Sequence, residues 1–163
     1  MKTGKSSLLV RTKKGMVCVN AGVDKSNVGK DEYCLLPTDP DSSAWVLSKV
    51  LNTPVVITDT QSRFYRRGLV NVAIGCFGLN PLKSYVGTTD PSGYQLNSSV
   101  IAVADELAAA AELVMGKVNQ VPVAVIRGYF YEPGAAGVGA DRIYDTRPEM
   151  TIKLREEQLN GSR

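Results

Sequence analysis

The pattern of apolar and polar positions predicts a chain that begins in β-structure. Short apolar runs occupy residues 7–12 (SLLVRT) and 16–20 (MVCVN), and the Lys-Lys-Gly turn between them predicts a β-hairpin. A continuous apolar run at residues 55–57, bounded by turn residues, predicts a strand that is covered on both faces. A further glycine-punctuated strand is expected over residues 69–77. These runs predict a hairpin followed by a central sheet.

Three helices are expected alongside the strands. A loop rich in proline, aspartate and serine at residues 36–43 can cap a short helix over residues 44–51. The alanine-rich stretch 98–116 is the strongest helix pattern in the chain, and Gly116 is expected to end it. A charged helix is expected over residues 147–159, beginning near a proline.

The remaining segments complete an α+β prediction. Residues 121–127 (VPVAVIR) are expected to form a buried strand, residues 79–93 mostly a loop, and residues 133–139 a glycine-rich loop. No internal repeat is visible, and a length of 163 residues favours one domain. We therefore expect residues 1–163 to form a single α+β domain with a mixed β-sheet and flanking helices.

Composition restricts the chemistry. The chain has no histidine, which excludes Ser-His-Asp and Cys-His nucleophile activation and every metal site that uses histidine. Its net charge of +3, from 19 basic and 16 acidic residues, gives no reason to expect binding to nucleic acid or to a membrane. Three cysteines without C-x-x-C spacing indicate buried thiols in a reducing compartment, and no signal segment is visible, so a cytoplasmic location is expected.

Two aspartates follow predicted strands. Asp59 lies just past the run at residues 55–57, where a carboxylate is either a metal ligand or a turn-forming residue. Asp24 lies in the segment 20–27 (NAGVDKSN), which concentrates hard-cation and phosphate ligands around one glycine. On composition alone, an ordinary turn stabilised by an aspartate or asparagine side chain is the favoured explanation of the second segment.

Other candidates for ligand binding have equally plain structural explanations. Arg63, Arg66 and Arg67 are interleaved with aromatic residues and could hold an anionic aromatic ligand, or they could lie on a solvated loop. The glycines of residues 133–139 do not have the spacing of a dinucleotide-binding loop.

Five segments taken in order resemble a known family. They are NAGVDKSN, LLPTDPDSSA, VVITDT, RRGLVNVAIG and AVADELAAAAELVMGK, which run from residue 20 to residue 117. The chain is similar to the coenzyme F420:L-glutamate ligase family, also called F420-0:gamma-glutamyl ligase. The similarity extends from about residue 8 to residue 128 and corresponds to the carboxyl-terminal part of the family's chain.

The resemblance implies an activity and its partners. Members of the family add L-glutamate to the phospholactyl end of coenzyme F420-0, using GTP and Mn²⁺ or Mg²⁺, with K⁺ as a further activator. It also implies the family's fold and a homodimer. Residue by residue, it implies that Asp24 and Asp59 are metal ligands and that Thr60 is a ligand of a second metal.

The same resemblance implies a nucleotide site. It makes Asn27 a GTP contact and the turn over residues 115–122 a GTP-binding loop, made of Met115, Gly116, Lys117, Val118, Asn119, Gln120, Val121 and Pro122. Arg63, Arg66 and Arg67 are possible partners for phospholactate or phosphate.

Two departures from the family pattern are visible. Lys117 stands where several members have a glutamate or glutamine that helps to hold the second metal, and an ammonium group cannot coordinate a cation. Members are also usually longer, and their amino-terminal part supplies further contacts to GTP and metal. The alternatives are therefore a non-catalytic or partial nucleotide- or deazaflavin-binding fragment, or a metal-dependent phosphohydrolase that uses the same aspartates.

Overall fold

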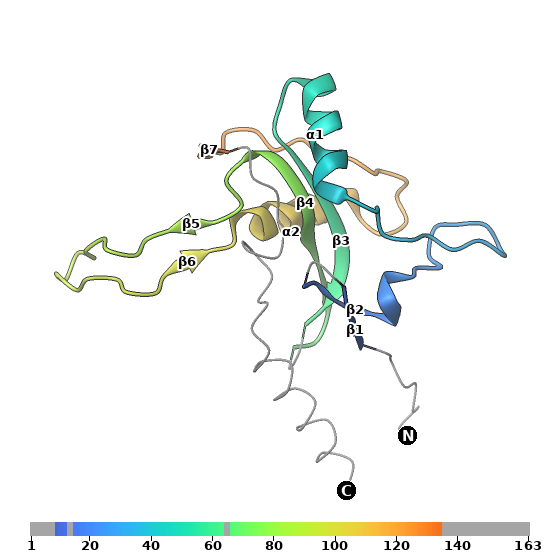
Figure 1. Cartoon of the computed structure of the whole chain (residues 1–163), viewed down its shortest axis with the longest axis horizontal. Helices are drawn as coiled ribbons and strands as arrows, with labels where there is room; N and C mark the ends of the chain where they lie inside the picture. The colour runs from blue at the N-terminus through green and yellow to red at the C-terminus, as the bar shows by residue number, and fades with distance from the viewer. Residues whose placement is uncertain (1–8, 13–14, 64–65, 135–163) are drawn as a thin grey trace, which may run out of the picture.

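The computed structural model describes residues 9–12, 15–63 and 66–134. Within these residues, two α-helices and several short strands surround one long antiparallel strand pair (Figure 1). In chain order the elements are β1 (Leu9–Arg11), β2 (Val17–Val19), the 3-10 turn η1 (Asn20–Gly22), α1 (Pro40–Leu51), β3 (Val55–Ser62), β4 (Leu69–Leu79), β5 (Lys83–Ser84), β6 (Val100–Ile101), α2 (Val103–Met115) and β7 (Pro133–Gly134).

The strand pair β3–β4 is the centre of the fold. β4 lies between β3 and β7, and every strand pair among the described residues is antiparallel. Ile57 pairs with Gly75 and Thr58 pairs with Ala73, so Ile74 is an extra residue that forms a β-bulge. The α+β class predicted from the sequence is confirmed.

The two faces of this strand pair are covered by different elements. On one face, Val56, Ala73 and Cys76 pack against Ala104 of α2. On the other face, Ile57 and Ile74 pack against the β1–β2 hairpin and the chain that follows it, through Met16, Cys18 and Leu36. Because neighbouring residues of a strand point to opposite faces, the side chains of β3 point alternately toward α2 and toward the β1–β2 hairpin.

Helix α1 begins earlier than its sequence pattern suggested. Asp39 caps the helix by accepting a hydrogen bond from the Ser42 amide (3.3 Å), and Pro40 occupies the first helical position. The predicted start at residue 44 is therefore wrong by one turn. This first turn lies directly on β4, where an added Cβ at Gly75 would be 2.4 Å from the carbonyl carbon of Pro40.

Helix α2 begins later than predicted, at Val103 instead of residue 98. Val100 and Ile101 instead form β6, which pairs with β5 and closes an arm that projects from the body (Figure 1). Gly116 ends the helix as expected, with its amide donating to the Glu112 carbonyl (2.9 Å).

Two other predictions have different outcomes. Residues 121–127 form no strand, because none of the described residues pairs with them. Of the predicted loop at residues 133–139, the first two residues form β7, and the others lie outside the described residues, as does the predicted helix 147–159.

Candidate functional site

Asp24 lies at the base of an exposed loop that begins after β2 and η1. The backbones of Asp24 and Cys34 exchange two hydrogen bonds, of 3.0 and 2.8 Å, which close the loop. The Asp24 carboxylate accepts hydrogen bonds from the side chain and the amide of Ser26, the latter at 2.8 Å. These bonds, and the positive charge of Lys117, lower the pKa of Asp24, so the turn also keeps a carboxylate ionised.

Asp59 lies within β3 rather than past its end, because the strand continues to Ser62. Its Oδ1 atom accepts a hydrogen bond from the Thr60 amide (2.8 Å). Burial raises the pKa of the Asp59 carboxyl, the charge of Asp24 raises it further, and Lys117 opposes both effects. Asp59 and Asp24 are therefore close enough to interact electrostatically, although they come from different elements.

A third charged residue, Lys117, lies near Asp24 and Asp59 and comes from the turn after α2. Lys117 acts electrostatically on both Asp24 and Asp59, and its carbonyl accepts a hydrogen bond from the Asn27 side chain (3.2 Å). Asn27 has φ 59°, a left-handed conformation that asparagine tolerates. The structure thus joins the loop of Asp24 and Asn27 to the predicted nucleotide-binding turn, 90 residues away in sequence.

The turn itself has a compact backbone. Gly116 has φ 62°, and a Cβ on it would lie 2.4 Å from Nδ2 of Asn119. Gln120 also has a positive φ of 57°. Residues 117–122 are exposed, so this backbone is open to a ligand.

Thr60 points away from the two carboxylates. Its hydroxyl donates to Oδ1 of Asn71 (2.8 Å), and Nδ2 of Asn71 donates to Glu112 on α2 (2.7 Å). This network lies on the α2 face of β3, whereas the charge of Asp59 acts on Cys18 on the opposite face. The structure brings Asp24, Asp59, Asn27 and Lys117 together, but it does not bring the Thr60 hydroxyl to them.

The three arginines lie on the connection between β3 and β4. Arg63 Nη2 donates to the carbonyl of Arg67 (3.5 Å), and the side chains of Arg63, Arg66 and Arg67 are exposed. Among the described residues, no hydrogen bond or ion pair joins these arginines to Asp24, Asp59 or Lys117. Their predicted role in binding phospholactate or phosphate stays a prediction.

The donor set is compatible with Mn²⁺ or Mg²⁺ bound together with a phosphate ligand. Within the described part of the chain, Asp59 Oδ2 makes no hydrogen bond, and no group of three or more Asp, Glu, Cys or His residues could hold a metal ion. Mg²⁺ is typically bound by one or two carboxylates plus substrate phosphates, rather than by a complete protein cage. Asp24 and Asp59 fit that pattern.

The sequence reasoning missed several polar residues that support the site. Asn71 is only 5% exposed and links β3 to α2, and Asp105 accepts a hydrogen bond from the Ala73 amide at the β-bulge (2.9 Å). Burial raises the pKa of the Asp105 carboxyl. A polar residue such as Asn71 inside an apolar strand pattern was the available signal, because such a residue needs a hydrogen-bonding partner.

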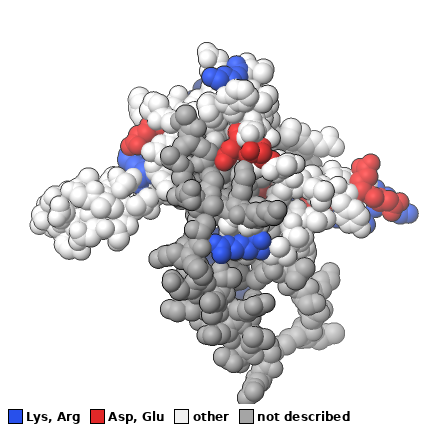
Figure 2. Space-filling view, viewed as in Figure 1, with Lys and Arg blue, Asp and Glu red and all other residues white. Residues whose placement is uncertain are grey.

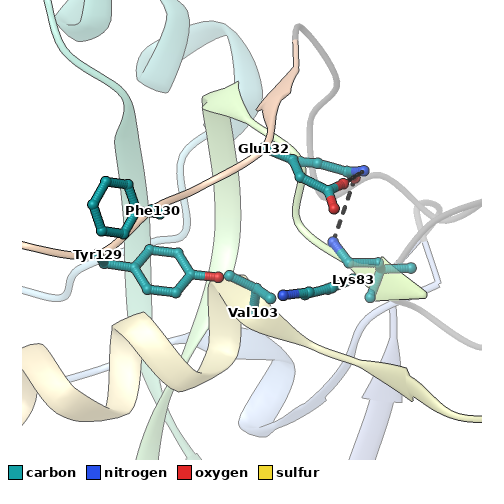
Figure 3. Close-up of a pocket in the computed structure, with 7 residues that line it drawn as sticks. Lys83, Val103, Tyr129, Phe130 and Glu132 are labelled. Atoms are coloured by element: carbon teal, nitrogen blue, oxygen red, sulfur yellow. Dashed lines mark hydrogen bonds between the residues drawn. The ribbon is translucent and has the colours of Figure 1, made fainter. Parts of the chain in front are cut away.

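A second polar depression lies at the base of the β5–β6 arm (Figure 3). It is lined by Asn80, Leu82, Lys83, Val103, Tyr129, Phe130 and Glu132. Hydrogen bonding and charge interaction with Tyr85 raise the pKa of Lys83. The depression has a volume of about 20 Å³, which is room for roughly one water molecule. It therefore does not offer a substrate site.

The distribution of charge on the described residues does not indicate a nucleic-acid or membrane surface (Figure 2). On the face shown in Figure 2, basic side chains of the described residues form small separate groups rather than a broad positive surface. Among the described residues, no helix has both the length and the apolar character needed to cross a membrane.

The fold and the cluster define an α+β domain in which two carboxylates, an asparagine and a lysine meet where one loop, strand β3 and the turn after α2 come together. Comparison with known protein families shows which family the chain belongs to. The family model described as F420-0:Gamma-glutamyl ligase matches residues 2–128, and the chain belongs to this family.

Relatives with assigned names agree with the family match. Proteins named coenzyme F420:L-glutamate ligase are 43% identical over 136 residues in Methanothermobacter thermautotrophicus and 42% identical over 154 residues in Archaeoglobus fulgidus. These matches cover 79% and 90% of this chain, but 54% and 60% of the two relatives. The chain therefore spans little more than half the length of these relatives.

Proposed function

We propose that this chain takes part in the GTP-dependent addition of L-glutamate to the phospholactyl end of coenzyme F420-0. The observation that carries the proposal is the convergence of Asp24, Asp59 and Lys117 from three separate segments, in a member of the F420-0:gamma-glutamyl ligase family. A cluster of charged and hydrogen-bonding groups that can position phosphate oxygens is the kind of site that phosphoryl transfer requires.

The proposed reaction has two steps, because joining a carboxylate to an amine in water is unfavourable. A carboxylate oxygen of the phospholactyl group takes the γ-phosphoryl group of GTP, which gives an acyl phosphate and GDP. The glutamate amine then attacks the acyl carbon and loses a proton. The amide forms, and inorganic phosphate leaves with the bonding electron pair of the broken C–O bond.

The two aspartates have different parts in binding. Ser26 keeps Asp24 ionised through two hydrogen bonds, whereas Asp59 is half-buried with one oxygen free of hydrogen bonds within the described residues. Both carboxylates would hold Mn²⁺ or Mg²⁺, with K⁺ as a possible activator. When bound, such cations neutralise charge on the phosphate oxygens and orient the transfer in line.

The nucleotide would lie against the turn at residues 115–122. Asn27 fixes this turn by donating to the Lys117 carbonyl, so the loop that holds Asp24 and the turn are positioned together. The Lys117 side chain supplies a positive charge near both aspartates, where it can offset the charge of a triphosphate. We assign Lys117 to phosphate rather than to metal, since an ammonium has no lone pair.

Binding of Mn²⁺ alone is the first test. Titration calorimetry should show that Asp59→Ala weakens Mn²⁺ binding more than about tenfold, because one of two carboxylate ligands is lost. The matched control is Asp31→Ala, which removes an exposed carboxylate from the Asp24 loop. Equal affinities in Asp59→Ala and the unsubstituted chain would refute the metal site.

The activity test follows glutamylated product by mass spectrometry, with F420-0, GTP, Mn²⁺ and glutamate supplied. Product that depends on all four components supports the ligase. Release of phosphate from GTP without glutamate would instead favour a phosphohydrolase. Nucleotide binding without any turnover would favour a non-catalytic binding fragment.

A further inference from the structure

Residues 121–127 have the sequence of a strand but no partner strand within residues 9–12, 15–63 and 66–134. Residues 121–126 (VPVAVI) form a short continuous apolar run rich in valine, which predicts a buried β-strand. Val123 is 69% exposed and Val125 is 74% exposed, which is unusual for the apolar positions of a strand. Further along the chain, Phe130 is 95% exposed, and its ring points away from Lys83 and Glu132 in Figure 3.

The backbone of this segment is equally unpaired. Among the described residues, no backbone amide or carbonyl of residues 121–131 takes part in a hydrogen bond. An extended backbone directs the N–H and C=O groups of alternate residues to opposite edges. Pro122 lacks an N–H group, so the edge formed by residues 122, 124 and 126 is interrupted, whereas the edge formed by residues 121, 123, 125 and 127 is intact.

The comparisons indicate what could occupy the intact edge. The match ends at residue 128 in the family model, and it covers 54% of the Methanothermobacter relative and 60% of the Archaeoglobus relative. In each relative the other part belongs to the same chain as the matched part, so its segments are available to this edge. An unpaired strand edge with exposed valines is the feature of this domain best suited to that packing.

We infer that residues 121–127 pair, through the edge of residues 121, 123, 125 and 127, with a strand from the part of the ligase that lies outside the matched region. The added strand extends main-chain hydrogen bonding, and its side chains cover Val123 and Val125. The pairing also fixes the chain immediately after the turn at residues 115–122. This inference rests on family membership and not on the proposed reaction.

Hydrogen–deuterium exchange is the test. It compares the 163-residue chain with a chimera in which this chain is joined to the part of the Methanothermobacter relative outside the match. We expect the amides of residues 123, 125 and 127 to exchange rapidly in the chain alone. In the chimera these amides should exchange at least about 100-fold more slowly, because each one donates a hydrogen bond to a partner strand. Metal and nucleotide are left out, so the result is independent of turnover.

Proline substitution identifies the edge. Val125→Pro removes an N–H group from the intact edge and should abolish the protection of neighbouring amides in the chimera. Ala124→Pro removes an N–H group from the edge that Pro122 already interrupts, and it should leave the protection in place. Val125→Ala keeps the N–H group and separates loss of the side chain from loss of the hydrogen bond.

Several outcomes would overturn the inference. Slow exchange of these amides in the chain alone, whether monomeric or dimeric by light scattering, would mean that this chain or a second copy covers the edge. A chimera that folds without protecting residues 121–127, or that fails to fold, would mean that the two parts are not complementary here. Equal effects of Val125→Pro and Ala124→Pro would assign the wrong edge.

Discussion

Substitution of Gly75 by alanine tests how closely helix α1 lies on the central strand. The added Cβ would be 2.4 Å from the carbonyl carbon of Pro40, 2.5 Å from its oxygen and 2.7 Å from its Cβ. These atoms belong to the backbone and ring of the first turn of α1, so no flexible side chain can move aside. Gly75 does not have a positive φ, so the substitution introduces a clash without backbone strain.

The cost follows from the displacement that the clash requires. Carbon atoms pack at about 3.5–4.0 Å, so the start of α1 must move roughly 1 Å from β4. Overpacking of this kind costs about 1–3 kcal/mol. The same movement stretches the 3.0 Å hydrogen bond from the Cys76 amide to Asp41 on α1. Bonds to charged groups contribute about 1.5–3 kcal/mol. We expect a loss of about 2.5–6 kcal/mol in the free energy of unfolding.

Urea denaturation measures this loss directly. The chain has one tryptophan, Trp45, which lies on α1, so its fluorescence reports on the helix that must move. The control is Gly87→Ala, where φ is +86° and no atom lies within 4 Å of the added Cβ. That variant should lose only about 1–2 kcal/mol, from left-handed backbone strain. A Gly75→Ala variant that loses no more than Gly87→Ala would refute the packing argument.

Three further results are expected. Lys117→Gln removes a positive charge beside two carboxylates, so calorimetry should show Mn²⁺ binding about threefold tighter or more, whereas Lys117→Arg should bind as before; unchanged affinity in the glutamine variant would contradict this. Asp105→Asn keeps an acceptor for the Ala73 amide but removes a charge whose pKa burial raises. A raised folded-state pKa makes the ionised group destabilising above the unfolded-state pKa. In urea titrations the asparagine variant should therefore gain stability relative to the unsubstituted chain as the pH rises above about 4. A difference that does not change with pH would argue against it. Finally, this chain alone should form glutamylated product at least about a thousandfold more slowly than a full-length relative, because several positioning contacts are expected outside the matched region; mass spectrometry that shows comparable rates would disprove it.

The sequence predicted the elements better than their ends. The observed start of α1 could have been recognised from the sequence, since Asp39 followed by Pro40 is a typical helix beginning. The start of α2 was not, because Val100 and Ile101 form a strand only through their pairing with β5. Local propensity contains no information about such a partner, and the same reason explains the missing strand at residues 121–127.

The candidate site was predicted in part. The family resemblance indicated Asp24, Asp59 and Asn27, and the structure brings them to one place with Lys117. The position of Thr60 on the other face follows from strand periodicity, but the predicted strand ended before it. The roles of these residues toward GTP and metal, and the expected homodimer, stay predictions.

Because of the β-bulge at Ile74, some positions of β4 tolerate the insertion or deletion of a residue better than others. On both sides of the bulge, the residues of β4 pair as they would in a regular strand pair, with Cys76 opposite Val56 and Ala73 opposite Thr58. Deleting Ile74 would remove one core side chain and leave every other residue on its present face. A one-residue deletion elsewhere in β4 would exchange the buried and exposed faces of all the residues beyond it. Among homologous chains, single-residue insertions and deletions in this strand should therefore be confined to the bulge.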